Sequence, residues 1–255
     1  MKLTNRLLLF YASLVMMLLI SSCSKEGGSN SIKILYGPSV SIGNGEGRAW
    51  VSEDIYGNPT AVGIDLSEAA LSNLPQMNQE YILQFNSNSI SHFYKFVCLN
   101  WSAHGHIPNP VYDISHFDVH FYNIEDSIRM MIGSNGSNEI TLAPATQYIP
   151  SNYEQLIGGA PTMGAHWFDL LAPEFNGSIF TKTFIWGSNN GQFIFWEPMI
   201  THDYLLTHPN SETSLRQPLA FQQDGWYPQS YTVKYSATTN KYTIALSKLA
   251  FKQGQ

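Results

Sequence analysis

Short apolar runs recur along the chain, many of them alternating with polar residues and bounded by turn-forming residues. Alternation with a period of two is typical of β-strands, whose successive side chains point to opposite faces of a sheet. The pattern predicts strands at residues 47–55, 60–66, 81–85, 93–101, 117–122, 179–186, 193–196, 230–236 and 242–246. Hairpin loops are predicted at residues 56–59, 188–191 and 238–241.

Helical patterns are short. They are predicted at residues 67–74, with Ser67 as the N-cap and Pro75 as the stop, and at residues 125–132, 151–157 and 200–206. None is long enough to be a repeated crossover helix of a parallel sheet. We therefore expect a mainly β fold, an antiparallel β-barrel-like or sandwich domain with short helical insertions, formed by residues 32–255 as a single domain.

The first residues carry the pattern of a bacterial secretory signal. Lys2 and Arg6 precede an apolar run over residues 7–20, and Ser22-Cys23 at its end resembles a lipobox. A transmembrane helix is the alternative, but the run is shorter than the roughly 20 residues that span a bilayer. We expect residues 1–22 to be a signal peptide, Cys23 to be lipidated, and residues 23–31 to be a flexible tether. The protein would then be anchored in the cell envelope, at the outer membrane, on its periplasmic or its outer side.

The composition narrows the range of partners. The chain has 13 basic and 19 acidic residues, and loss of Lys2 and Arg6 with the signal leaves 11 against 19, a formal charge of −8. This balance argues against a nucleic acid partner. With Cys23 committed to lipid, Cys98 is the remaining thiol, so no intramolecular disulfide is expected.

The most chemically informative segment is residues 116–122, with the sequence HFDVHFY. In a strand, His116, Asp118 and His120 leave one face, and the phenylalanine and valine side chains between them leave the other. One face is suited to packing, and the other to coordination or hydrogen bonding.

A second alternating pair, His104 and His106, lies about ten residues upstream. A proline-rich turn at residues 107–112 separates the two segments. We expect this turn to fold the pairs against each other and to bring four imidazoles together.

Two later residues are candidates to complete a metal site. His166 lies beside a tryptophan, and Glu197 follows an aromatic run just before a proline. A buried carboxylate at such a position needs a metal, a cation or several donors to offset its desolvation. The predicted metal ligands are His106, His116, His120, His166 and Glu197, with Asp118 orienting one imidazole. The ion would be divalent, with Zn, Mn, Fe and Cu as the candidates.

The histidine cluster is also compatible with two arrangements that need no metal. Histidines on a strand form structural hydrogen-bond networks, and the same residues could line a metal-free catalytic or small-ligand pocket. The chain has no glycine-rich phosphate loop, no Gly-x-Ser-x-Gly elbow, no Cys-x-x-Cys pair and no His-Glu-x-x-His helix. A serine or cysteine hydrolase therefore has little support.

Two sets of resemblances bear on these residues. His104-Gly105-His106 superficially resembles the His-x-His pair of cupins and α-type carbonic anhydrases, but the wider motif of neither family is present. The segments 105–108, 116–122, 163–167 and 197–201 together resemble an uncharacterised family of secreted bacterial β-rich proteins that includes a Thermus member under extracytoplasmic-function sigma factor control. Asn109 stands where that resemblance leads us to expect a second proline.

The family resemblance implies a single β-rich domain that assembles into a ring-like homo-oligomer. It implies no reaction, and it favours His106 over His104. We therefore expect an extracytoplasmic, lipid-anchored protein with a divalent-metal or small-ligand site, and we leave undecided whether it is an enzyme. The alternative is a non-enzymatic envelope-stress or scaffold protein in which the same residues form a buried network or a subunit interface.

Overall fold

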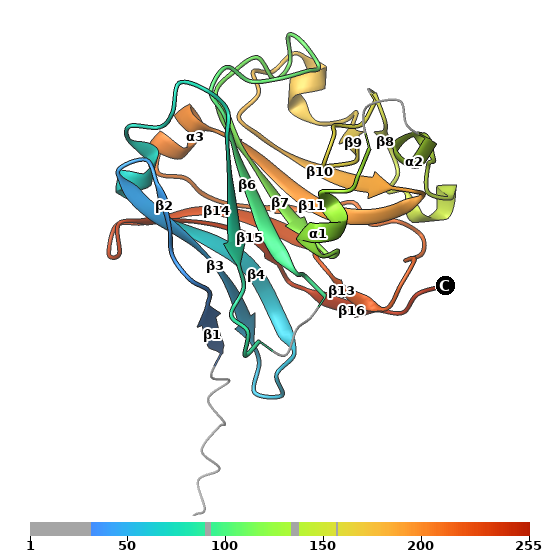
Figure 1. Ribbon diagram of the computed structural model, residues 1–255, viewed down its shortest axis with the longest axis horizontal. Coiled ribbons are helices and arrows are strands. Elements are labelled where there is room, and N and C mark those ends of the chain that lie inside the picture. Colours follow the sequence, from blue (N-terminus) through green and yellow to red (C-terminus); the bar gives the residue numbers. More distant parts are fainter. Residues whose placement is uncertain (1–31, 90–92, 134–137, 157) are drawn as a thin grey trace, which may run out of the picture. The chain divides into compact units, whose positions relative to one another are not determined.

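Two antiparallel sheets form the framework of the computed structural model, which describes residues 32–89, 93–133, 138–156 and 158–255. The predicted signal peptide, lipidation site and tether all lie outside these ranges. The first sheet has the order β1-β3-β4-β15-β14-β12, with β2 pairing β3 at one side (Figure 1). Its strands are β1 (Lys33–Tyr36), β2 (Val40–Ile42), β3 (Gly45–Glu53), β4 (Pro59–Ser67), β12 (Asn210–Ser214), β14 (Ser230–Ser236) and β15 (Lys241–Ser247).

The second sheet has the order β5-β6-β7-β11-β10-β9-β8. Its strands are β5 (Gln79–Gln84), β6 (Phe96–Ser102), β7 (His116–Tyr122), β8 (Tyr153–Glu154), β9 (Ala165–Asp169), β10 (Lys182–Asn189) and β11 (Gln192–Thr201). A separate two-stranded ribbon pairs β13 (Gly225–Tyr227) with β16 (Ala250–Lys252). The short helices are η1 (Glu68–Leu71), α1 (Asp126–Arg129), α2 (Asn138–Thr141), η2 (Thr146–Tyr148), η3 (Pro173–Asn176) and α3 (His202–Leu206).

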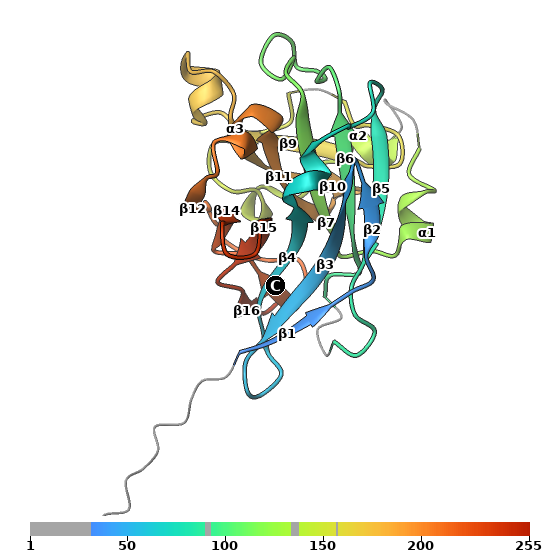
Figure 2. The same ribbon diagram turned by 90° about the vertical axis from the view of Figure 1, so that its left-hand side faces the viewer.

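The two sheets pack face to face around the main hydrophobic core (Figure 2). The second sheet contributes alternate residues of its central strands, such as Phe117, Val119 and Phe121 of β7. The first sheet contributes matching positions, such as Ile64 of β4 and Leu246 of β15. Each sheet remains open at its ends, so the predicted mainly β fold is confirmed in its sandwich form and the barrel form is not adopted.

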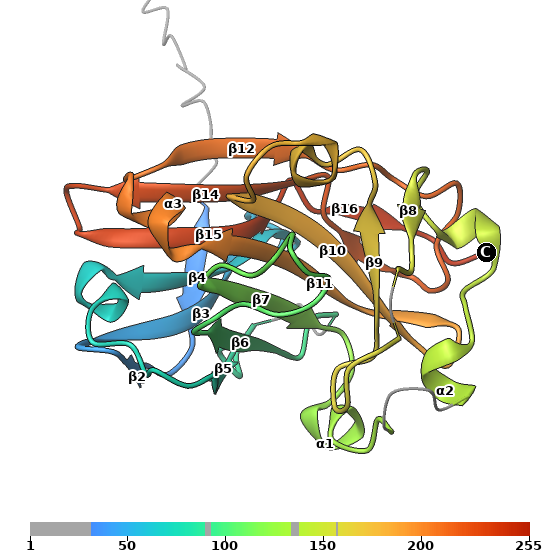
Figure 3. The ribbon, with the colours of Figure 1, turned by 90° about the horizontal axis from the view of Figure 1, so that it is seen from above.

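The outer face of the second sheet is covered as well. A second apolar cluster combines β-strand residues such as Phe195 with Tyr112 from a loop, Ile132 after α1 and Ile140 of α2. Figure 3 shows α1 on the side of β11 that faces away from β14 and β15. Every residue of β7 is consequently buried, whichever face it points to.

The predicted hairpins are confirmed, because β3 and β4, β10 and β11, and β14 and β15 pair antiparallel across them. The helix predicted at residues 151–157 is wrong: Tyr153 and Glu154 form β8 and pair with β9, while residue 157 lies outside the described residues. The helix predicted at residues 67–74 is reduced to one turn, and Ser67 does not cap it, because its hydroxyl accepts the Glu46 N–H.

The packing of the two sheets predicts that two leucines differ in how much they contribute to the free energy of unfolding. Leu246 is fully buried in the core, whereas Leu219 is 91% exposed in a loop. Leu246→Ala is expected to lower the free energy of unfolding by about 2–5 kcal/mol, because it removes buried contacts and leaves a cavity. Leu219→Ala should change it by less than about 0.5 kcal/mol. Urea unfolding of both variants measures the difference, and equal losses would contradict this arrangement of the core.

Candidate metal centre

The polar side of β7 lies on the outer face of the second sheet, opposite the sandwich core. The pairing with β6 places Ser102 opposite His116, Asn100 opposite Asp118 and Cys98 opposite His120. The predicted alternation is therefore correct. The ionisable side chains lie beneath covering loops, however, and not inside a barrel, because the apolar face of β7 is the one that fills the space between the sheets.

β11 supplies Glu197 from the other side of β7. Trp196 pairs with Phe121 and Met199 with Asp118, so the register is unchanged between them and Glu197 lies opposite His120. Pro198 has no N–H to donate to the ladder, and the pairing with β7 skips these two positions. The strand nevertheless continues to Thr201, past the end predicted at residue 196, and the helix predicted at residues 200–206 begins only at His202.

His106 reaches the same face from the loop between β6 and β7. Gly105 adopts a left-handed conformation with φ +72°, and a Cβ there would lie 2.0 Å from the carbonyl oxygen of Tyr112. The next N–H, that of His106, donates to the same carbonyl at 3.1 Å. This close return of the loop brings the His106 side chain to His116. His104 is exposed, so the four expected imidazoles do not meet, and His106 is the member of the pair that lies beside His116.

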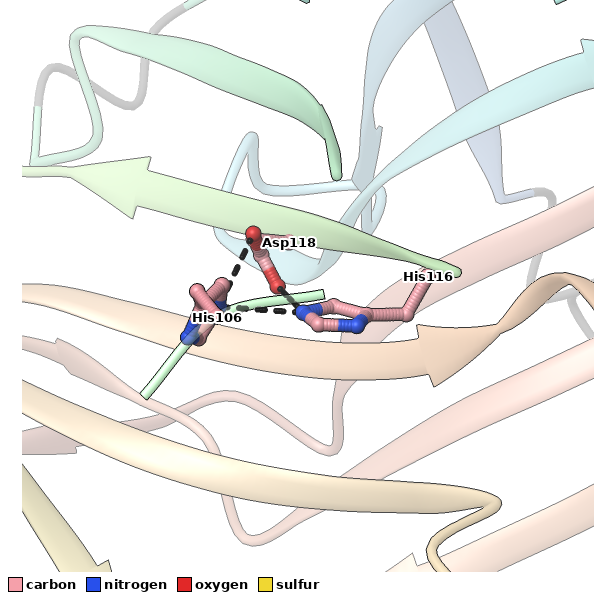
Figure 4. A group of neighbouring side chains, drawn as sticks. All are labelled: His106, His116 and Asp118. Carbon is pink, nitrogen blue, oxygen red and sulfur yellow. Dashed lines mark hydrogen bonds and ion pairs between the residues drawn. The ribbon is translucent and has the colours of Figure 1, made fainter. Parts of the chain in front are cut away.

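His106, His116 and Asp118 form the first of two groups with donor atoms close enough to hold an ion (Figure 4). The Nε2 atoms of the two histidines are 3.0 Å apart. Asp118 places Oδ1 2.9 Å from His116 Nε2 and Oδ2 3.4 Å from His106 Nε2. Metal–ligand bonds of about 2.0–2.2 Å separate neighbouring donor atoms by roughly 3–3.5 Å, so these spacings suit one shared ion.

The remaining atoms of this group are held by other parts of the chain. His116 Nδ1 donates to the Ile114 carbonyl, and His106 Nδ1 lies 2.7 Å from the Ile107 carbonyl. The Ser102 hydroxyl donates to Asp118 Oδ2 at 3.0 Å. Metal-binding histidines commonly use their second nitrogen in this way, which fixes the ring and leaves the first nitrogen as a ligand.

These contacts require a positive charge within the first group. When both Nδ1 atoms carry the hydrogen, the neutral Nε2 atoms present lone pairs toward each other and toward a carboxylate. Such a cluster is stable only with a positive charge among its members, either a proton on one imidazole or a metal ion. Burial disfavours the ionised form of Asp118, but the charge of His116 and hydrogen bonds from both histidines hold the pKa of Asp118 well below its usual range.

His120, His166 and Glu197 form the second group. His120 Nε2 lies 3.4 Å from Glu197 Oε1, and His166 Nε2 lies 3.6 Å from Glu197 Oε2. His120 and Glu197 are each 1% exposed. The His120 Nε2 atom and the Glu197 Oε2 atom find no hydrogen-bond partner within the part of the chain that the structure describes. Buried polar atoms in this state are costly, and folded proteins rarely leave them without a ligand, ion or water.

Burial dominates the protonation of this second group. It lowers the pKa of His120 to about 3, helped by the charge of His166, and the pKa of His166 to about 4, helped by the charge of His106. It raises the pKa of Glu197 well above its usual range, with the nearby Asp118 carboxylate acting in the same direction. Without a bound cation, both imidazoles therefore favour their neutral forms at neutral pH, and burial shifts Glu197 toward its neutral form.

Both groups open on one cavity of about 490 Å³. Its lining includes His106, Asp118, His120, His166 and Glu197 but not His116. The start of β5 and the end of β6 also line it, as do the segment 158–161 and Met163. His106 is the most exposed of the candidate ligands, with 34% of its side chain accessible. Two groups of possible ligands thus share one space large enough for a small molecule.

All five ligands predicted from the sequence lie on this face, but they divide into two groups where a single set was expected. Asp118, predicted only to orient an imidazole, is itself a direct member of the first group. Ser102 was not among the predicted residues, because its place opposite His116 depends on the pairing of β6 with β7.

Comparison with protein-family models, curated proteins and solved structures found no match to this chain. Function is therefore inferred from the geometry of these side chains.

The low pKa of His166 predicts how stability changes with pH. In chelator-treated protein, the unfolded chain binds this proton near pH 6.5 and the native state only near pH 4. His166 therefore reduces stability as pH falls from about 6.5 toward 4. His166→Asn should lose less stability than the parent over this range, by about 2–3 kcal/mol.

Urea unfolding at pH 7 and pH 4.5 measures this difference. Glu197 changes the free energy of unfolding in the opposite direction, because its raised pKa stabilises the native state at low pH. This contribution is present in both proteins, so it is removed when the variant is compared with the parent. Parallel pH profiles for the two proteins would show that His166 is not desolvated in the native state.

Proposed function

We propose that this protein is an extracytoplasmic, lipid-anchored protein that binds a divalent metal ion through His106, His116 and Asp118. One observation carries the proposal: two Nε2 atoms 3.0 Å apart face each other beside a carboxylate, while each ring uses its Nδ1 atom on a backbone carbonyl. A divalent cation satisfies all three donor atoms at once.

The donor set limits the identity of the ion. Two imidazoles and one carboxylate, without sulfur, suit Zn, Mn, Fe and Cu among the divalent ions. Two histidines with one carboxylate also occur at catalytic zinc and non-haem iron sites, which keep positions open for water or substrate. Because His106 faces the cavity, an ion held here is accessible to a small ligand. It would polarise that ligand or activate a water molecule.

A buried polar network is the second candidate. It is favoured by the 2.9 Å contact between His116 and Asp118 and by the Ser102 hydroxyl, which together form a connected ion pair once one imidazole is protonated. In that case the residues stabilise the fold or an oligomer, as in the scaffold alternative. The two candidates differ in what removal of metal does to the melting temperature.

The envelope location is proposed from the N-terminal pattern, in which Cys23 lies outside the described residues. Among residues that the structure does describe, no helix has the length and hydropathy needed to cross a membrane. The homo-oligomer and the family membership are predictions that rest on the resemblance of the cavity segments to secreted bacterial proteins. A small-molecule ligand is proposed from the cavity, and no nucleic acid partner is proposed.

His106→Ala is expected to weaken binding of Zn²⁺ by about tenfold or more, because one of three ligands is lost while its partly exposed position limits damage to the fold. His104→Ala is the matched control, since His104 is two residues away and exposed. Competition titration with a chromophoric chelator measures both affinities.

Thermal melts complete this test. The parent should lose several degrees in melting temperature when chelator is added, and His106→Ala should lose less. Equal zinc affinity of parent and His106→Ala, together with melts that do not respond to chelator, would favour the polar network.

Cys23→Ser should abolish lipid attachment, because thioether formation requires the thiol. Labelling of expressing bacterial cells with a fatty-acid analogue, followed by membrane fractionation, measures this outcome. Lipid incorporation at the parent level in the variant would contradict the predicted anchor.

A further inference from the structure

We propose that His120, His166 and Glu197 bind a second divalent cation, and that the two ions together make the cavity a site for a small oxyanion. This inference rests on the proposed function, because the first ion is the one held by His106, His116 and Asp118. Four features of the site support it: the unpaired state of the second group, its spacing, its separation from the first group, and the charge of the cavity.

The second group has buried donor atoms without partners. His120 and Glu197 are almost completely buried, and His120 Nε2 and Glu197 Oε2 make no hydrogen bond within the described residues. A water molecule or an ion can reach both side chains, because they line the cavity. Buried polar side chains that face a cavity without internal partners indicate a ligand, an ion or water at that position.

The spacing within the group suits a cation better than a hydrogen-bonded cluster. Hydrogen bonds between a carboxyl group and an imidazole are about 2.7–3.2 Å long. The contacts of Glu197 with His120 and His166 are 3.4 and 3.6 Å. Donor atoms around an ion with bonds of about 2.1 Å are separated by roughly 3.4 Å in tetrahedral geometry.

The pairing of β7 with β11 keeps the two groups apart. Asp118 lies opposite Met199, so Glu197, two residues earlier on β11, is its diagonal neighbour. Diagonal neighbours in an antiparallel pair are about 7–8 Å apart, too far for one carboxylate to bridge two ions through adjacent oxygens. The geometry therefore favours two separate ions in the same cavity, each bound by its own carboxylate.

The charge of the loaded cavity determines the class of ligand. Two divalent cations carry four positive charges. Of the three carboxylates that line the cavity, Asp118 and Glu197 neutralise two of these charges, and Glu80 is paired with the Arg129 guanidinium at 2.9 Å. The excess positive charge in a partly enclosed site favours an anion. Asn78 also lines the wall, with its Oδ1 atom accepting the Ala103 N–H, so its amide nitrogen is the donor that remains. A small phosphate or carboxylate compound fits these features and the volume of about 490 Å³.

Metal stoichiometry tests the second ion. Purified mature protein is loaded with Zn²⁺, dialysed and measured by elemental analysis. The parent should retain two equivalents, and both Glu197→Gln and His106→Ala should retain one. His166→Asn provides a second variant of the group should Glu197→Gln fold poorly. Glu154→Gln, an exposed carboxylate on β8 of the same sheet, is the matched control and should retain two equivalents.

Inorganic phosphate tests the ligand class. Calorimetry of the Zn-loaded parent should show saturable phosphate binding, and Glu197→Gln should weaken it by about 30-fold or more, because one of the two cations is lost. Phosphate binding that is absent, or equally strong after metal removal, would overturn the oxyanion site.

The outcomes separate this inference from the function on which it depends. A single equivalent that His106→Ala abolishes and Glu197→Gln leaves intact would overturn the second ion and retain the first. A single equivalent with the opposite response would overturn the assignment of the first ion. No retained metal in the parent would overturn both.

Discussion

Burial of both faces of β7 is the constraint around which the rest of the structure is organised. Its inner face fills the sandwich core, and its outer face carries two imidazoles and a carboxylate that are covered by loops and short helices. Ionisable groups removed from water need partners, because their desolvation costs several kcal/mol when it is not offset. The loop that brings in His106, the unbroken register of β11 and the placement of His166 on β9 all bring such partners to this face.

The two groups on this face meet that constraint differently. The first has a supporting layer of backbone carbonyls and a serine hydroxyl, which holds its lone pairs in one orientation. The second has well-placed donor atoms, but among the described residues the Nε2 atom of His120 and the Oε2 atom of Glu197 have no hydrogen-bond partner. A cation resolves both situations, although in the first group a proton can take its place.

The register of the second sheet determines which side chains face the cavity. A shift of one residue in the pairing of β7 would move every histidine to the sandwich core and every phenylalanine to the cavity. Pro198 does not disturb the register even though it lacks an N–H for the ladder. Gly187 of β10 lies between Phe195 and His166, and a Cβ there would overlap the Phe195 ring. The two aromatic rings can therefore lie side by side, with centroids 5.1 Å apart.

The sequence by itself determined the fold class, three hairpins and the two faces of β7, because these depend on local alternation and turn chemistry. It also indicated all five candidate ligands through unusual polar residues in apolar surroundings. It did not reveal their division into two groups, the direct role of Asp118 or the contribution of Ser102. Those features depend on which strands pair and in what register, and such contacts join residues distant in the chain. Only the tertiary structure decided them.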